Sequence, residues 1–375
     1  INSRGIQIDK ELVKGALAID ADHKSALLNR AVNITGLVNP NSRNQLLAWL
    51  NDNSELDIDK LTKETVAESL QVATGPAAEV LRIRKALAKS SVSKYEAMDR
   101  AVCDDGRIRG VLQFYGANRT GRWAGRLVQV QNLPHDVPTA IDTAIQLAKH
   151  GDINAMELLY GNVSDTLSRL IRAAFVAKDG YTLCVSDFSA IEARVLSWLA
   201  GEQWRMDVFA NGGDIYCASA SSMFGVPVVK HGENGHLRQK GKVAELALGY
   251  QGGPNALIAM GAIKQGLAED ELPDIVQRWR SANLRIKDYW YAVDGAATSV
   301  MQDARPVGID HGIIFARECN LLYGYDYLTI QLPSGRKLYY PQPYLADNQF
   351  GRPAIHYRTQ VGSKWANTST YGGKL

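Results

Sequence analysis

The sequence has 375 residues, 46% of them hydrophobic and 22% charged, with a formal net charge of +3. A chain of this length can bury a large core, which predicts two or three domains. No apolar stretch is long enough to span a membrane and no secretory signal opens the chain, so a helical membrane protein is not expected. Because the net charge is small, total charge alone gives no evidence for a polyanionic partner. The four cysteines are scattered without metal-ligand spacing, which favours reduced thiols in a cytosolic protein.

Residues 10–100 have a mostly helical pattern, and Ser42 stands before an apolar stripe where a helix N-cap is expected. The amphipathic segment 78–95, "AEVLRIRKALAKSSVSKY", carries a run of cations: Arg82, Arg84, Lys85, Lys89 and Lys94. Two interpretations stay open for this run. It is either a solvated helix face or a surface that contacts a phosphate backbone, where basic side chains release counterions.

The residue pattern and the composition change from Asp105 onward. The first part of "DGRIRGVLQFYGANRTGRWAGRLVQVQNLP" alternates like a strand, and the second part gathers Arg119, Arg122 and Arg126. Residues 137–200 then mix helix and strand signals, and residues 201–300 are helical with glycine-rich breaks. Residues 327–342 predict a hairpin that turns at "PSGR". The predicted class is therefore α+β.

Two acids flank a predicted strand-to-helix junction. The run "YTLCVSDF" is β-branched and aromatic enough to be a buried strand, and it ends at Asp187. Glu192 lies about one turn into the following helix. A carboxylate at a strand end can hold Mg²⁺, a hard ion that prefers oxygen ligands and phosphates. The alternative is that Asp187 is a helix N-cap or first-turn acid, favoured by the helix dipole.

A second helix, in "LRQKGKVAELALGYQGG", places two cations on one face. At about 100° per residue, Lys242 lies about 40° and Gly249 about 20° from Arg238. Like charges at this spacing repel unless an anion lies between them, and a triphosphate suits an Arg fork beside a Lys point charge. Two solvated cations are the alternative, and no Walker-type phosphate loop is present. Together, Asp187 and this helix suggest phosphoryl or nucleotidyl transfer.

Three ordered segments resemble the family A DNA polymerases, such as DNA polymerase I, and especially their bacteriophage-type branch. "RTGRWAGRLVQVQNLP" resembles the family's "TGR…LQNIP" segment, "SDFSAIEARVLSWLAGE…GGDIYCASASSMFGVP" resembles its motif A, and "RQKGKVAELALGYQGG" resembles its motif B. Weaker matches, "GIQID", "NSRNQL" and "LPSGRKLYY", extend the likeness over nearly the whole chain. The resemblance implies a right-hand polymerase fold with a helical thumb, part of the palm sheet and mostly helical fingers.

The resemblance also implies roles for individual residues. Asp187 resembles the first metal-binding catalytic aspartate, with the Phe188 carbonyl as a further metal ligand. Glu192 resembles the acid that blocks a ribose 2′-hydroxyl, with Tyr250 as its partner. The implied nucleotide-binding set is completed by Arg238, Lys242 (also expected to be catalytic), Ser189, Leu246 and Tyr216. The implied DNA-binding set is Arg122, Gln131 and Asn132 at the minor groove, with Arg119, Arg84 and Lys89.

Some positions depart from the family pattern. Leu246 stands where many relatives have Phe or Tyr, and Tyr216 stands where a histidine is common. Motif C, a His-Asp-Glu hairpin that carries the second catalytic aspartate, is missing, because the one His-Asp pair, His135–Asp136, lies upstream of motif A and lacks the Glu. The chain opens at Ile1 without a methionine and stops at "NTSTYGGKL". We therefore expect a fragment that ends inside the fingers, before motif C.

The expected division is a thumb with a short palm lead-in over residues 1–100, part of the palm over 101–190, including the motif A strand, and truncated fingers over 191–375. The expected parent is a DNA polymerase of phage or prophage origin in the cytoplasm of a bacterial host. It would use primer-template DNA, deoxynucleoside triphosphates and two Mg²⁺ ions, and act as a monomer. The fragment alone is expected to be inactive. Two rivals are a non-catalytic primer-template binding module and an unrelated Mg²⁺-dependent phosphohydrolase.

Overall fold

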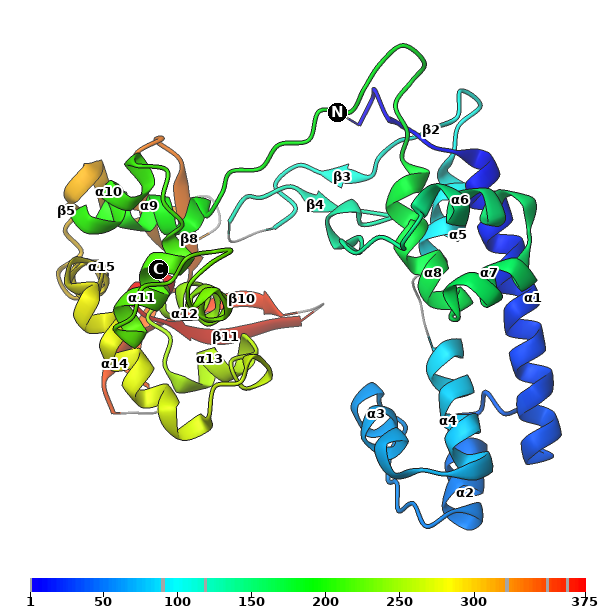
Figure 1. The fold of residues 1–375 in the computed structure, drawn as a ribbon. Helices are drawn as coiled ribbons and strands as arrows, with labels where there is room; N and C mark the ends of the chain where they lie inside the picture. Colours follow the sequence, from blue (N-terminus) through cyan, green and yellow to red (C-terminus); the bar gives the residue numbers. More distant parts are fainter. Residues whose placement is uncertain (1, 89–91, 118–119, 321–323, 349–350, 362–363) are drawn as a thin grey trace. The chain divides into compact units, whose positions relative to one another are not determined.

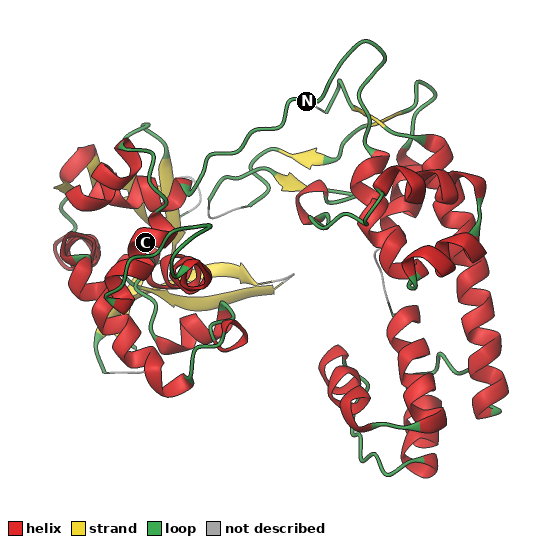
Figure 2. Cartoon of the chain, in the orientation of Figure 1, coloured by secondary structure: helices red, strands yellow, loops and turns green. Residues whose placement is uncertain are grey.

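The structure is a computed structural model that describes residues 2–88, 92–117, 120–320, 324–348, 351–361 and 364–375. It divides into two compact units, Ile1–Val185 and Ser186–Leu375 (Figure 1). Figure 2 shows helices dominating the first unit and a mixture of helices and strands in the second. The predicted α+β class is confirmed. Among the described residues, no helix is both long and apolar enough to cross a membrane.

The first unit is built mainly from helices, as the pattern over residues 10–100 predicted. Asp9 caps the long first helix by accepting from the amide of Leu12, and Gly36 ends it with a φ of 68°. Ser42 accepts from the amide of Gln45, which confirms the predicted N-cap. The helices are α1 (Lys10–Thr35), α2 (Arg43–Asn53), α3 (Lys63–Val72), α4 (Gly75–Leu87), α5 (Ser93–Ala101), α6 (Ile141–His150), α7 (Ile153–Tyr160) and α8 (Val163–Leu170).

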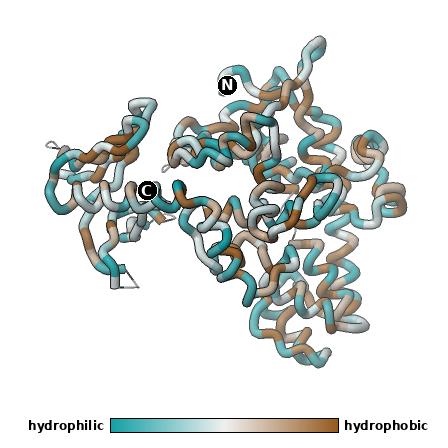
Figure 3. Tube along the Cα trace, turned by 60° about the vertical axis from the view of Figure 1, so that its left-hand side comes forward, coloured by the Kyte–Doolittle hydropathy of each residue, from teal (hydrophilic) through white to brown (hydrophobic). Residues whose placement is uncertain are grey.

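Two separate cores stabilise this unit. One lies between α2, α3 and α4 and includes Leu46, Leu50 and Leu81, all nearly inaccessible to solvent. The other packs α1 against α5, α6 and α8 around Leu12, and apolar and polar residues interchange along these helices (Figure 3). Gly15 allows α1 to approach α6 closely, since a Cβ at this position would lie 2.0 Å from the carbonyl oxygen of Ala148.

The strands of the first unit are short. β1 (Ile6–Gln7) pairs with β2 (Arg107–Ile108), and β3 (Leu112–Gln113) pairs with β4 (Ala124–Gly125), both antiparallel. The alternating stretch after Asp105 thus forms two-residue strands and loops. The described residues of the cationic segment 78–95 belong to α4 and α5 or flank them.

The predicted buried strand before Asp187 is wrong. Residues 181–188 are exposed and irregular, and no described strand pairs with them. Strand propensity expresses how well a residue fits a pleated, half-buried surface, and it has no effect where no neighbouring strand supplies that surface. The strand expected among residues 137–200 is therefore absent from the described residues, which form helices and loops there.

The second unit begins with a helical part, as predicted for residues 201–300. Its core surrounds the stacked rings of Trp279 and Trp290, whose centroids are 6.0 Å apart. The helices are α9 (Ile191–Ala200), α10 (Gln203–Ala210), α11 (Ile215–Phe224), α12 (Arg238–Leu248), α13 (Pro254–Ala259), α14 (Leu272–Ala282) and α15 (Leu284–Asp303).

Two antiparallel sheets follow α15 and pack against it. The first has the order β5-β6-β7-β8 and comprises β5 (Val307–Ile309), β6 (Ile313–Asn320), β7 (Tyr325–Gln331) and β8 (Lys337–Pro341). The second has the order β11-β10-β9 and comprises β9 (Tyr344–Asp347), β10 (Pro353–Val361) and β11 (Lys364–Thr370). The predicted hairpin over 327–342 is confirmed as β7 and β8, whereas the other strands were not predicted.

Candidate functional site

Asp187 lies in an exposed loop that leads into α9. The loop ends at Ala190, whose φ of 50° is left-handed and whose side chain makes no capping hydrogen bond. Asp187 is therefore not the N-cap of α9, and Glu192 is the acid of the first turn. The Ser189 carbonyl accepts from Arg194 Nε at 2.9 Å, which ties the loop to the helix. Asp187 and the adjacent Phe188 are both exposed, Phe188 to 78%.

The structure brings Glu192 and Tyr250 together. The Tyr250 hydroxyl donates to Glu192 Oε2 at 2.6 Å, so the start of α9 is joined to the turn that follows α12. Both side chains are exposed on the same side of the unit's helical part. The hydrogen bond from Tyr250 thus fixes the position of the Glu192 carboxylate at the start of α9.

The predicted cationic face of α12 is the face that is not buried. Arg238, Lys242 and Leu246 follow one another at four-residue spacing and are exposed or half-buried. The opposite side of α12 is buried, including Gly241, where a Cβ would lie 2.1 Å from the Tyr216 carbonyl oxygen. The close contact of α11 with α12 thus leaves the cationic face outward.

Arg238 has an acidic partner that the sequence reasoning missed. Its Nε lies 2.7 Å from Asp214 Oδ2, and its guanidinium lies 5.2 Å from the Tyr216 ring centroid. Asp214 is also the N-cap of α11, a role that its place before an apolar run could have indicated. Burial, together with the neighbouring Glu245 and Asp214 carboxylates, raises the pKa of the Tyr216 phenol, which stays neutral. An anion that binds Arg238 must therefore compete with Asp214.

A buried polar network lies behind α12, and nothing in the sequence pattern singled it out. Glu245 accepts from both terminal nitrogens of Arg205, from the Ser219 hydroxyl at 2.5 Å and from Trp279 Nε1 at 2.8 Å. Arg205 also donates to the Ser197 hydroxyl at 2.8 Å and to Asn283 at 2.9 Å. The Arg205 and Glu245 side chains are 0% and 3% exposed. One ion pair thus connects α9, α10, α11, α12 and α14.

The turn after α12, which carries Tyr250, is held by three contacts. Trp290 Nε1 donates to the Gly249 carbonyl, Arg280 to the Gly252 carbonyl, and the Gly373 amide to Gln251 Oε1, each at 3.0 Å. Gln251 has a φ of 62°, and a Cβ at Gly252 would lie 2.2 Å from the Ala247 carbonyl oxygen. The position of Tyr250 is therefore set by α14, α15 and the end of the described chain.

In the first unit, the residues expected at a minor groove surround the short β4. The Gln131 side chain lies over Gly125, where an added Cβ would be 1.8 Å from its Oε1. Asn132 donates to Gln129 Oε1 at 3.2 Å, and its carbonyl accepts from Lys94 Nζ at 3.0 Å. Burial lowers the pKa of the Lys94 amino group. Gln131 and Asn132 are exposed together with Arg122 and are available for polar contacts.

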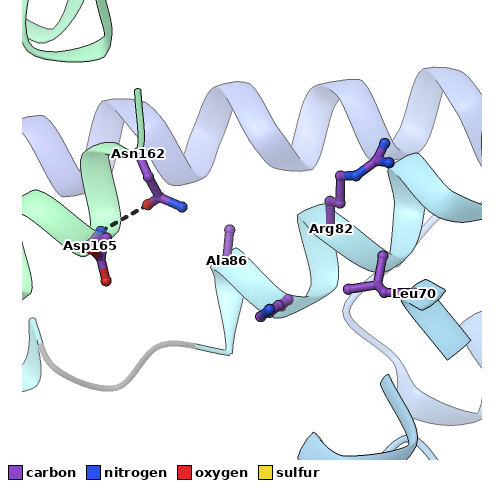
Figure 4. A pocket seen from close by; sticks show the side chains of 6 residues that line it. Leu70, Arg82, Ala86, Asn162 and Asp165 are labelled. Atoms are coloured by element: carbon purple, nitrogen blue, oxygen red, sulfur yellow. Dashed lines mark hydrogen bonds between the residues drawn. The ribbon is translucent and has the colours of Figure 1, made fainter. Parts of the chain in front are cut away.

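The cations of α4 line part of an open pocket of about 570 Å³. Arg82 and Lys85 line this pocket together with Leu70, Ala86, and Asn162 and Asp165 at the start of α8, and Asn162 and Asp165 lie at the other end of the view from Arg82 (Figure 4). Arg84 is half-buried on another side of the same helix. Lys89 and Arg119 lie outside the described residues.

Metal ligands of this chain are sparse in the described ranges. No group of three or more His, Cys, Asp or Glu side chains is placed to hold a metal ion there. Asp187 and the Phe188 carbonyl supply oxygen donors, the type that Mg²⁺ prefers. Cys103, Cys184 and Cys319 are exposed thiols and Cys217 is a buried one.

Comparison with known proteins gives consistent matches. The family model described as DNA polymerase family A matches residues 17–299. The DNA polymerase of Bacillus phage SP02 is 51% identical over 378 aligned residues, which cover 100% of this chain and 57% of that protein. DNA polymerase I of Mycobacterium tuberculosis is 26% identical over 317 residues, covering 80% of this chain and 31% of that protein. The chain thus spans little more than half of the phage protein.

A solved structure has a similar fold. It is the POL domain of Pol1 from M. smegmatis in complex with DNA primer-template and dNTP, which matches with a TM-score of 0.55 and 20% identity. The match covers 82% of this chain and 49% of that one. The predicted polymerase fold class is thereby confirmed.

Proposed function

Because the chain belongs to DNA polymerase family A, we propose that it forms part of a template-directed DNA polymerase. In this proposal residues 1–100 are the thumb with a palm lead-in, 101–190 part of the palm, and 191–375 the fingers. The parent polymerase would extend primer-template DNA with deoxynucleoside triphosphates, as a monomer in the cytoplasm of a bacterial host. The observation that carries the proposal is the outward cationic face of α12 in the same unit as the Glu192–Tyr250 pair and Asp187.

In the proposed reaction, the primer 3′-hydroxyl oxygen attacks the α-phosphorus of the incoming nucleotide. A new phosphorus–oxygen bond forms, the bond to the departing pyrophosphate breaks, and the hydroxyl proton is released to water. Arg238 would exchange its Asp214 partner for the triphosphate, and Lys242 would stabilise the negative charge that develops on the pyrophosphate. Ser189, Tyr216 and Leu246 would border the nucleotide, and Glu192 would exclude a ribose 2′-hydroxyl.

Asp187 and the Phe188 carbonyl fit Mg²⁺ by donor type, because both offer hard oxygen atoms. Two bound Mg²⁺ ions would supply charge stabilisation at the attacking and leaving oxygens. Holding Mg²⁺ requires the charged carboxylate of Asp187, because an asparagine amide has the same shape but carries no negative charge. The DNA contacts would come from Arg122, Gln131 and Asn132 at the minor groove and from Arg84, Lys89 and Arg119 at phosphates.

The decisive experiment is primer extension by the parent polymerase with Asp187→Asn. We expect loss of extension with little change in primer-template affinity. The matched control is Asp274→Asn, which removes an exposed acid of α14 in the same unit and should leave extension intact. Extension by the Asp187→Asn variant at the rate of the unchanged enzyme would exclude Asp187 from the reaction.

One observation favours a second candidate, a primer-template binding module without catalysis. Within the described ranges, Asp187 stands in an open loop and no further acids gather beside it to complete a metal site. Such a module would bind DNA through the cations of the first unit, with affinity falling by a log–log salt slope of about −0.9 per neutralised phosphate on duplex DNA. Salt-dependent binding without extension by the parent would support it, and extension by the parent would exclude it.

A further inference from the structure

The strands β10 and β11 form a ribbon whose outer half is largely exposed. Seven ladder pairs join the two strands, from Ile355↔Thr370 to Val361↔Lys364. Residues 364–367 are all exposed, and their side chains alternate between the two faces, so both faces of the outer half meet solvent. A two-stranded ribbon has little stability of its own. Large exposed side chains on it therefore suggest a binding role, since they do not stabilise a core.

One face of this ribbon combines aromatic rings, a cation and amides. Residues that pair across an antiparallel ladder share a face, and alternate residues point to opposite faces. His356, Arg358 and Gln360 therefore share a face with their pairing partners on β9 and β11. We name it the Arg358 face, and it includes Tyr344, His356, Arg358, Gln360, Trp365, Asn367 and Ser369.

The aromatic and cationic groups of the Arg358 face are already arranged as stacks. The Tyr344 and His356 rings lie 5.2 Å apart with an interplanar angle of 23°. The Arg358 guanidinium lies 5.8 Å from the Trp365 ring centroid, and Gln342 accepts from it at 3.5 Å. Trp365 is nevertheless 59% exposed. A large ring that is pre-oriented by a guanidinium and still open on one side is suited to receive another planar group.

The charge around this face favours an anionic partner. Among its paired residues the face carries one cation, Arg358, and no acid, because Asp347 pairs with Pro353 and lies on the opposite face, as does Lys364. The ribbon also lies beyond residue 299, where the match to the family model ends.

We propose that the Arg358 face binds single-stranded DNA. Unpaired bases would stack on Trp365, a backbone phosphate would meet the Arg358 guanidinium, and Gln360 and Asn367 would offer hydrogen bonds to base edges. Duplex DNA is a poorer ligand, because its bases already stack on one another and are not open to a tryptophan. The choice of an unpaired template strand as the occupant rests on the proposed polymerase function, whereas the binding itself does not.

The test is binding of a labelled oligothymidylate of about 12 nucleotides to the full chain, followed by fluorescence anisotropy at several salt concentrations. We expect Trp365→Ala to weaken binding roughly 5- to 100-fold and Trp365→Phe, which keeps a ring, to retain most of it. Arg358→Ala should weaken binding and reduce the log–log salt slope by about 0.7.

Lys364→Ala is the matched control, because it removes a cation from the opposite face of the same ribbon. Equal losses from Arg358→Ala and Lys364→Ala, or no loss from Trp365→Ala, would overturn the proposal. Photocrosslinking of an oligonucleotide that carries 5-iododeoxyuridine locates the contact independently, and the crosslink is expected in the peptide that contains Trp365. A crosslink confined to the first unit would also overturn the proposal.

These measurements separate the failure of this inference from the failure of the proposed function. If the parent polymerase extends primers but Trp365→Ala and Arg358→Ala leave oligothymidylate binding unchanged, only the proposed role of the Arg358 face is refuted. Binding that depends on Trp365 and Arg358 without any primer extension would refute the catalytic proposal and leave the single-strand site standing.

Discussion

Glu245→Gln tests whether the buried ion pair behind α12 holds the helical part of the second unit together. The glutamine keeps the shape of the side chain but loses the charge. One of its two oxygens becomes an NH₂ group that faces the donors of Arg205. Because Arg205 is 0% exposed, water cannot replace the lost carboxylate oxygen.

The expected cost follows from this burial. Removing one partner of a buried pair leaves an uncompensated charge and destabilises a protein by about 3–5 kcal/mol. The amide of the new glutamine can turn its oxygen toward Ser219 and Trp279, so that both keep an acceptor. In that orientation its NH₂ group faces a terminal nitrogen of Arg205, and two donors then meet. The whole stability of a domain is about 5–15 kcal/mol, so the variant should lose a large share of it.

The assay is urea unfolding followed by tryptophan fluorescence, which reports on Trp279 within the network. Asp274→Asn is the control, because its pair with Arg278 is exposed and such pairs contribute less than about 1 kcal/mol. The double variant Arg205→Met with Glu245→Leu should recover much of the loss, since apolar side chains of similar volume leave no buried charge. A cost for Glu245→Gln no larger than that of Asp274→Asn would refute the reasoning.

Three further predictions concern the sugar, the triphosphate and helix packing. In the parent polymerase, Glu192→Ala should raise ribonucleotide use relative to deoxyribonucleotide use by roughly 10–200-fold, measured as the ratio of the two kcat/KM values; an unchanged ratio would remove Glu192 from sugar selection. Lys242→Ala should raise the KM for nucleotides and leave primer-template affinity nearly unchanged; the opposite result would mean that α12 faces DNA phosphates. Gly15→Ala should lower the free energy of unfolding of the first unit by about 1–3 kcal/mol in urea, because its Cβ would lie 2.0 Å from the Ala148 carbonyl oxygen. Gly295→Ala in α15, with no atom within 4 Å of the added Cβ, is the matched control and should not destabilise the second unit.

The sequence by itself determined the features that depend on neighbours along the chain. The helical periodicity of residues 10–100 and 201–300, the Ser42 cap and the hairpin at "PSGR" are local, because each arises from residues within a few positions of one another. The common side of Arg238, Lys242 and Leu246 on α12 is local in the same way, because their four-residue spacing fixes it, whereas the packing of α11 turns that side outward. The family resemblance also rested on ordered local motifs, and the comparison with known proteins confirmed it.

Only the tertiary structure decided what depends on distant partners. Residues 181–187 have the composition of a strand, yet they remain irregular, because a strand requires a neighbouring strand to take its backbone hydrogen bonds. Asp214 beside Arg238 and Glu245 beside Arg205 are separated by 24 and 40 residues, so no periodicity links them. A buried charge is stable only where the folded chain places an opposite charge beside it, and the tertiary packing decides which residues become such neighbours.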